Sequence, residues 1–280
     1  MGITAVSDPD FIEHIRKDRN MNIFDTHAHY YDDRFAEEYE GGVEGAVEAA
    51  LEGGVRHIVN IGTNLDSSRT CLSLADRYPT LYAAVGIYPH EATYRDMEAT
   101  VDELRTMLRH PKAVAIGEIG LDYHWDDVDR ETQKAWFERQ LILAEETGYP
   151  VVIHDREAHG DCLEAIRRHP DVTGIFHSYS GSAEMVKEIV KLGWYVSFSG
   201  VVTYKNAAKT KEAAAATPLD RLLMETDCPY LPPVPHRGKI NHSTYLVYTA
   251  AELAAIKGIS SEELIRRTAE NAKKIFRIEE

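Results

Sequence analysis

The sequence alternates short apolar segments with longer segments of helical periodicity, and this alternation constrains the fold more than any other feature. Eight of the segments are rich in β-branched residues and too short for ordinary helices, which predicts buried strands. They are residues 22–29, 57–63, 81–88, 113–119, 151–154, 173–177, 195–199 and 222–227. Strands that alternate with helices are typical of parallel sheets with crossover connections. The pattern therefore predicts an α/β protein.

Helices are expected in the intervening segments. They are residues 44–52, 66–78, 96–109, 130–147, 158–169, 183–192 and 204–216, followed by a longer helical region after residue 243. The clearest boundaries are those of the segment 130–147, because Asp129 can cap its start and Gly148 can end it. Near the C-terminus, Ser260 and Glu263 form a capping-box pattern ahead of a last amphipathic helix.

Eight strand–helix pairs suit closure into a (β/α)8 TIM barrel, which typically needs about 250 residues. A doubly wound sheet with an additional lobe follows the same alternation and remains the alternative on pattern alone. The chain has 280 residues, so we expect a single barrel domain over residues 21–280 and an N-terminal extension over residues 1–20. The last amphipathic helix is expected to cover the outside of the barrel.

Charge and composition argue against several classes of protein. The chain has 31 Lys and Arg against 46 Asp and Glu, a net charge of −15, which disfavours a protein that wraps duplex DNA through many phosphate contacts. The cysteines, Cys71, Cys162 and Cys228, are too few and too scattered for a disulfide framework or a cysteine zinc site. The first twenty residues lack the apolar core of a signal peptide, and no uncharged run is long enough for a membrane helix. We expect a cytoplasmic protein without membrane contact.

Metal-ligand side chains stand at the ends of the predicted strands. The first strand ends in Asp25-Thr26-His27-Ala28-His29, and strand alternation places Asp25, His27 and His29 on one face. The other strands contribute Glu118, His154, His177, Glu225 and Asp227. A single histidine at a strand end is more often a structural residue. So many metal-ligand side chains at the ends of different strands, however, favour a metal site. Because functional groups of a TIM barrel sit at the carboxyl ends of its strands, these positions favour the barrel over the doubly wound sheet.

Imidazole and carboxylate ligands without thiolates favour Zn, Mn, Co or Fe in an open catalytic site. Six candidate ligands exceed one tetrahedral site and suit two metals about 3.5–4 Å apart, an arrangement that assists phosphodiester hydrolysis. Glu118 is the expected bridge between the two metals. Asp25 and Glu225 lie two residues deeper, where a carboxylate can accept the distal N–H of a ligating histidine, although ordinary buried polar contacts explain them equally well.

Five ordered motifs carry a resemblance to a known family. They are Asp25-Thr26-His27-Ala28-His29, Gly117-Glu118-Ile119-Gly120-Leu121-Asp122-Tyr123, Ile153-His154-Asp155-Arg156, His177-Ser178-Tyr179-Ser180-Gly181 and Glu225-Thr226-Asp227-Cys228-Pro229-Tyr230-Leu231. Together they closely resemble the TatD family of metal-dependent deoxyribonucleases in the amidohydrolase superfamily, over about residues 22–276.

The resemblance implies a TIM barrel that hydrolyses phosphodiesters, often from DNA ends, with two divalent metal ions such as Mg, Mn, Zn or Co. By the same resemblance, one metal would be held by His27, His29, Glu118 and Asp227, and the second by Glu118, His154 and His177. The implied partner is a nucleic acid, namely single-stranded DNA or DNA ends. The oligomeric state stays open.

Two segments depart from the usual pattern of the family. Tyr88, in Gly86-Ile87-Tyr88-Pro89-His90, replaces a histidine of a Gly-x-His-Pro-His run, and Ile240-Asn241-His242-Ser243 replaces an Arg-Asn-Glu-Pro run. Both are expected in loops beside the substrate. They leave the proposed ligands intact and bear on substrate preference.

Catalytic roles are expected for Asp227, as the base that takes a proton from the attacking water, and for Glu118. Expected substrate contacts are His90, Arg156, Ser178 and Arg237. A surface ion pair is the alternative for Arg156, and a solvated loop is the alternative for Arg237 and its neighbour Lys239. The aromatic residues 123–125 are candidates for stacking on a base, or for simple loop packing.

Two other classes of function share these residues. The same barrel supports amidases, lactonases and deaminases, although no lysine near Glu118 is available for a carbamylated-lysine centre. A non-catalytic metal-binding scaffold is the remaining alternative, and the presence of every expected ligand argues against it.

Overall fold

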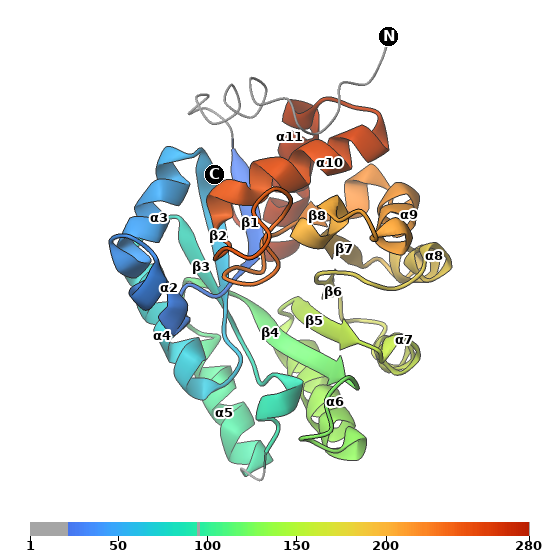
Figure 1. Ribbon diagram of the computed structural model, residues 1–280. Coiled ribbons are helices and arrows are strands. Elements are labelled where there is room, and N and C mark those ends of the chain that lie inside the picture. Colours follow the sequence, from blue (N-terminus) through green and yellow to red (C-terminus); the bar gives the residue numbers. More distant parts are fainter. Residues whose placement is uncertain (1–21, 94–95, 280) are drawn as a thin grey trace.

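The computed structural model of the protein describes residues 22–93 and 96–279, so the expected extension over residues 1–20 lies outside the described part. Eight parallel strands form one sheet in sequential order (Figure 1). They are β1 (Ile23–Ala28), β2 (Val55–Ile61), β3 (Leu81–Val85), β4 (Ala113–Asp122), β5 (Val151–Arg156), β6 (Gly174–Phe176), β7 (Tyr195–Phe198) and β8 (Leu222–Met224). All eight predicted strands are confirmed, with ends that shift by a few residues.

The sheet closes where the segment after β8 returns to β1. Ala28 forms a parallel bridge with Cys228, the His29 N–H donates to the Cys228 carbonyl at 2.8 Å, and the Asp227 N–H donates to the His27 carbonyl at 2.8 Å. The buried Asp25 carboxylate adds to this seam, because it accepts from the Thr226 hydroxyl at 2.6 Å. The fold is therefore a (β/α)8 TIM barrel, and the doubly wound alternative is wrong.

Helices surround the strands (Figure 1). They are α2 (Asp33–Glu38), α3 (Gly42–Glu52), α4 (Leu65–Arg77), α5 (Met97–Met107), α6 (Arg130–Thr147), α7 (His159–Arg168), α8 (Ala183–Lys191), α9 (Ala208–Ala216), α10 (Leu246–Lys257) and α11 (Ser261–Phe276). Short 3₁₀ turns are η1 (Pro89–Glu91), η2 (Gly200–Thr203), η3 (Leu219–Arg221) and η4 (Ser243–Tyr245). Helix α2 was not predicted, because its six residues are too few to show a period of 3.6.

Capping side chains begin the helices where the sequence predicts them. The Asp129 side chain accepts from the Thr132 N–H at the start of α6, and Gly148 ends that helix in the left-handed conformation with φ 72°. Ser260 caps α11 by accepting from the Glu263 N–H. The segment expected to be helical from residue 204 becomes an α-helix only at Ala208.

The first half of the last helix covers the outside of the barrel, and its end closes the amino end of the barrel, which the sequence did not predict. Its first half, with Leu264 and Ile265, joins the outer hydrophobic core. Its end joins the inward-facing strand residues, and Phe276 stacks on Phe24 of β1 with ring centroids 6.0 Å apart. An amphipathic pattern shows that a helix packs but not against what, so the sequence could not distinguish these partners.

None of the helices in the described ranges combines the length and the apolar composition that a membrane crossing requires.

We predict that Phe276→Ala lowers the free energy of unfolding by about 3–5 kcal/mol, because it removes a buried ring from the closed end of the barrel. Chemical denaturation followed by circular dichroism measures this change. Lys274→Ala, an exposed position on the same helix, is the matched control and is expected to change stability by no more than about 0.5 kcal/mol. A loss below about 1 kcal/mol for Phe276→Ala would contradict this role.

Candidate metal centre

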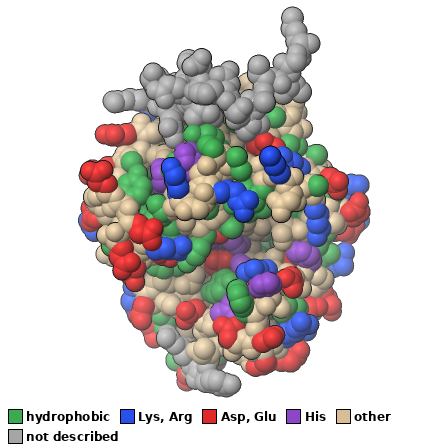
Figure 2. All heavy atoms as spheres, in the orientation of Figure 1, with side chains coloured by type: hydrophobic (Ala, Val, Ile, Leu, Met, Phe, Trp, Pro, Cys, Tyr) green, Lys and Arg blue, Asp and Glu red, His purple; other side chains and the backbone are tan. Residues whose placement is uncertain are grey.

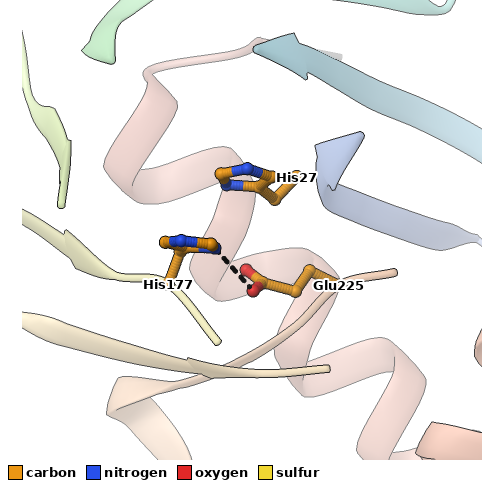
Figure 3. Close-up of side chains that lie close together, drawn as sticks. All are labelled: His27, His177 and Glu225. Atoms are coloured by element: carbon orange, nitrogen blue, oxygen red, sulfur yellow. Dashed lines mark hydrogen bonds and ion pairs between the residues drawn. The ribbon is translucent and has the colours of Figure 1, made fainter. Parts of the chain in front are cut away.

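The six predicted ligand residues meet at the carboxyl end of the barrel. Two come from the end of β1, one from β4, one from β5 and one each from the segments that follow β6 and β8. They are His27, His29, Glu118, His154, His177 and Asp227. Figure 3 shows two of these side chains, His27 and His177, lying face to face, with ring centroids 4.0 Å apart. The structure thus brings together side chains that lie up to 200 residues apart in sequence.

Four ligand atoms form a first group. The His27 Nε2 lies 3.1 Å from the His29 Nε2, and each of these nitrogens faces the same two carboxylates. Glu118 Oε2 lies 3.5 Å from His27 Nε2 and 3.8 Å from His29 Nε2. Asp227 Oδ1 lies 3.5 Å from His27 Nε2 and 3.3 Å from His29 Nε2. Four ligands of a tetrahedral metal at about 2.0–2.1 Å lie roughly 3.3–3.4 Å apart, so this group fits a metal ion.

Three ligand atoms form a second group around the other oxygen of the same glutamate. Glu118 Oε1 lies 2.8 Å from His154 Nδ1 and 2.8 Å from His177 Nε2, and these two nitrogens are 3.1 Å apart. Each oxygen of Glu118 therefore belongs to a different group. This is the arrangement of a carboxylate that bridges two metal ions.

The shape of β4 brings Glu118 into this position. The pairing between β4 and β5 shifts register between Ile116 and Ile119, and Gly120 adopts a positive φ of 134°. A Cβ atom at Gly120 would lie 2.1 Å from the carbonyl oxygen of His154, so only glycine allows the two strands to approach this closely.

Three of the four imidazoles are held by a second hydrogen bond on their distal nitrogen. The His29 Nδ1 lies 2.9 Å from the Ile61 carbonyl oxygen, which can only accept, so His29 Nε2 is left for the first group. The His177 Nδ1 faces Glu225 Oε1 at 3.3 Å, as predicted for Glu225 (Figure 3). The His154 Nε2 lies 3.0 Å from Asp122 Oδ2. Such partners fix the tautomer and the orientation of metal-binding histidines.

Asp25 does not hold a ligating imidazole, so of the two explanations left open for it, ordinary buried polar contacts are the correct one. Its carboxylate accepts from the Thr226 backbone N–H at 3.0 Å and from the Ser243 hydroxyl at 2.7 Å, and from the His27 backbone rather than the ring. The His27 Nδ1 is buried and has no hydrogen-bond partner among the described residues. A bulge in β1 between Asp25 and Ala28 breaks the alternation on which the expectation rested.

Asp122 also belongs to this centre, although its sequence position suggested no role for it. It follows Glu118 by four residues, so an extended β4 places both carboxylates toward His154. The predicted strand ended at residue 119 because the glycines around Glu118 obscure the strand pattern. The Tyr88 hydroxyl donates to Asp122 Oδ2 at 3.2 Å and lies 3.3 Å from His154 Nε2, so the residue that departs from the family pattern also touches this histidine.

The charges of the centre depend on one another. Burial alone would raise the pKa of Glu118, but attraction to His177 and hydrogen bonds from the surrounding imidazoles hold that pKa well below its ordinary value. Burial likewise opposes ionisation of Asp227, and a hydrogen bond from His29 lowers its pKa. Burial alone would lower the pKa of His177, but attraction to Glu118 and hydrogen bonds to Glu118 and Glu225 together raise it. Two buried anions therefore face a cluster of imidazoles, a charge distribution that suits bound cations.

The centre opens into a cavity of about 690 Å³, within the usual range for ligand sites. Arg156, Ser178 and Tyr230 line its walls. Figure 2 shows the face hollowed near its middle, with histidine and basic side chains around the hollow. Ser178 has a positive φ of 37°, and its hydroxyl lies 2.8 Å from that of Ser199.

Two expected substrate contacts lie outside the lining of this cavity. His90 packs beside the second group, with its Nε2 3.4 Å from Asp122 Oδ2. The Arg237 guanidinium lies 4.5 Å from the centre of the Tyr204 ring. Asn241 and Ser243, in the second segment that departs from the family pattern, support the loop after β8: the Asn241 amide donates to the Thr226 carbonyl at 2.9 Å. That segment therefore supports the closure of the barrel between β8 and β1, and its residues do not line the cavity.

A TIM barrel with this histidine and carboxylate cluster at its carboxyl end has the architecture of a metal-dependent hydrolase. The chain belongs to the TatD family, because the family model for TatD related DNases matches residues 24–277.

Relatives of known sequence and structure agree. The uncharacterized metal-dependent hydrolase YabD of Bacillus subtilis is 41% identical over 259 residues, which cover 91% of this chain and 99% of YabD. The uncharacterized metal-dependent hydrolase TatD of Mycobacterium tuberculosis is 36% identical over 230 residues, covering 80% of this chain and 86% of that protein. The crystal structure of the TatD homolog YjjV from Escherichia coli superimposes with a TM-score of 0.85 at 30% identity, covering 92% of this chain and 99% of YjjV.

We predict that Asp122→Ala weakens binding of one metal ion by about 10- to 100-fold, because His154 loses the partner that orients its ring. Calorimetric titration of the metal-free protein with Zn²⁺ or Mn²⁺ measures the affinity. Asp126→Ala, four residues further along the chain and exposed, is the matched control and is expected to leave both affinities unchanged. Equal affinities for Asp122→Ala and the unmodified protein would contradict the role of Asp122.

Proposed function

We propose that the protein is a TatD-like deoxyribonuclease that cleaves phosphodiester bonds with two divalent metal ions. The observation that carries the proposal is the division of the Glu118 carboxylate between two ligand groups, Oε2 beside His27 and His29 and Oε1 beside His154 and His177. In this proposal Glu118 bridges the ions, and Asp227 completes the first group. When bound, such a pair of Mg, Mn, Zn or Co ions acidifies a water molecule and neutralises the charge of a phosphate.

Asp227 is the proposed general base. Its carboxylate lines the cavity beside the first ligand group, and although burial opposes ionisation, the neighbouring imidazoles hold its pKa below the ordinary value. An ionised carboxylate at this position can take the proton of the attacking water. The residue has a positive φ of 59°, an unusual conformation for a side chain other than glycine, and its N–H is fixed to the His27 carbonyl. Backbone strain of this kind clusters at functional sites.

Arg156 and Ser178 are the proposed phosphate contacts. Arg156 is exposed on the wall of the cavity and forms no ion pair among the described residues, so its guanidinium is available for a phosphate oxygen. Ser178 lines the cavity from the neighbouring segment, directly after β6, and its hydroxyl lies 2.8 Å from that of Ser199. His90 and Arg237 remain predicted contacts that would require movement of their loops toward the substrate.

Single-stranded DNA or DNA ends are the proposed substrates, and the cytoplasm is the proposed location. A negatively charged chain does not suit extended duplex binding, whereas a cavity of limited size suits a single strand or an end. The three cysteines are buried and free, which is compatible with a reducing compartment. Residues 21–280 form the proposed single domain, and the extent of the family match supports it.

We predict that Asp227→Asn lowers kcat by about 100-fold or more on a labelled single-stranded DNA, the usual scale for loss of a positioned base. The exposed Asp220, in η3 at the other end of β8, is the matched control: Asp220→Asn is expected to keep the activity of the unmodified protein. Circular dichroism checks that both variants fold. A fully active Asp227→Asn protein would rule out this role.

We also predict that chelation abolishes hydrolysis and that added metal restores it.

Metal analysis is expected to find two ions per chain in the unmodified protein and one in His154→Ala. It is expected to find weakened binding of both ions in Glu118→Gln, because only Glu118 belongs to both groups. Loss of a single ion in Glu118→Gln would contradict the bridge. Hydrolysis of amides or lactones, with none of phosphodiesters, would contradict the proposed substrate class.

A further inference from the structure

Two exposed aromatic rings lie near the cavity: Tyr230 is part of its lining, and Trp125 lies beside Arg156, which also lines it. Trp125 is 56% exposed and Tyr230 is 45% exposed, which is unusual for side chains of this size. Each ring is accompanied by an arginine, Arg156 for Trp125 and Arg34 for Tyr230. The two pairs belong to different parts of the barrel, because Tyr230 follows Asp227 after β8 and Arg156 follows His154 on β5.

Tyr230 is held rigidly beside the first ligand group. Its ring centroid lies 6.0 Å from that of His29, and the Arg34 guanidinium lies 4.1 Å from the centre of the ring. Its hydroxyl donates to Asp32 Oδ2 at 3.0 Å, and Arg34 donates to the same carboxylate at 2.8 Å. One face of the ring is thus covered by Arg34, and the Asp32 charge at this rim is neutralised.

Trp125 lies beside Arg156, which follows His154 of the second ligand group by two residues on β5. The Arg156 guanidinium lies 5.7 Å from the centre of its ring, and the His124 ring packs edge-on at 4.8 Å. The neighbouring Tyr123 does not offer a free ring, because its hydroxyl donates to Asp161 at 2.6 Å and the Arg130 guanidinium covers its face. Of the aromatic residues 123–125, Trp125 is therefore the one available for stacking.

We infer that Trp125 and Tyr230 are two base-stacking positions that hold nucleotides on opposite sides of the scissile phosphate. The inference rests on the proposed function and specifies its substrate: a single strand that extends beyond the cleaved bond in both directions. A flat, exposed ring suits a nucleotide because it can stack on the base, and beside Trp125 the Arg156 guanidinium, which forms no ion pair among the described residues, can attract the phosphate. Bases in a duplex already stack on their neighbours, so the two rings favour unpaired nucleotides.

The test uses the metal-loaded protein and a thymidine dinucleotide whose phosphorothioate linkage resists hydrolysis. Trp125 can report directly, because the other two tryptophans, Trp136 and Trp194, are only 4% and 1% exposed. We expect the dinucleotide to quench tryptophan fluorescence and Trp125→Phe to abolish the quenching. Fluorescence anisotropy of a labelled dinucleotide gives Kd for every variant.

Trp125→Ala and Tyr230→Ala are each expected to raise the Kd of the dinucleotide by roughly 5- to 100-fold, the scale of one lost stack. Trp125→Phe and Tyr230→Phe keep a ring and are expected to stay near the original Kd. Thymidine monophosphate, with one base, is expected to lose affinity in one alanine variant only. Leu192→Ala, an exposed apolar position at the end of α8, is the control and is expected to change nothing.

An unchanged Kd in either alanine variant overturns the inference, as does quenching that persists in Trp125→Phe. Hydrolysis of unmodified DNA separates this result from the proposed function. If both alanine variants bind and cleave DNA as the unmodified protein does, the stacking positions are wrong and the nuclease proposal stands. If the protein hydrolyses no phosphodiester but the two variants lose affinity as expected, the proposed function is wrong and the two binding positions stand.

Discussion

The organisation of the centre depends on one buried carboxylate, Glu118, which is surrounded by imidazoles from three other strands. An isolated carboxylate buried at this depth would be strongly unfavourable, so each of its oxygens needs a positively charged or hydrogen-bonding group beside it. The barrel supplies that environment by bringing β1, β5 and β6 to the same rim as β4. The irregular course of β4, with its register shift and the close approach at Gly120, is a local departure from ideal strand geometry that places the carboxylate at the centre of this cluster.

A second layer of contacts connects the centre to the closure of the barrel. Glu225 orients His177 and also accepts from the Ser178 backbone, while the adjacent Thr226 is bound by Asp25 of β1. The residues that join β8 to β1 thus lie directly beside the residues that orient the ligands. A substitution that disrupts the contacts between the segment after β8 and β1 would therefore disturb the orientation of the ligand side chains as well as the closure of the barrel. This explains why polar residues as different as Asp25 and Glu225 are completely buried at the end of adjacent strands.

Most of the barrel could be predicted from the sequence, because each strand is a compact apolar run and each helix has its own period and boundary residues. The ligand residues could also be predicted. A barrel brings the carboxyl ends of all its strands to one rim, so a residue at the end of a predicted strand is expected to lie at that rim. What could not be predicted depends on departures from regular geometry. The bulge in β1 turned Asp25 away from the imidazoles, the irregular extension of β4 revealed Asp122 as a partner of His154, and the packing of α11 under the barrel required knowledge of the tertiary structure.

The position of α11 has a consequence for how the protein acquires its activity during synthesis. Translation proceeds from the N-terminus, so α11, which closes the amino end of the barrel, is synthesised after all eight strands and after the segment that carries Asp227. A nascent chain that stops before residue 227 therefore contains β1 to β7 but lacks both the full ligand set and the helix that closes the interior. The ligand set is complete only once Asp227 has been synthesised, and the interior can be closed only once α11 has followed it.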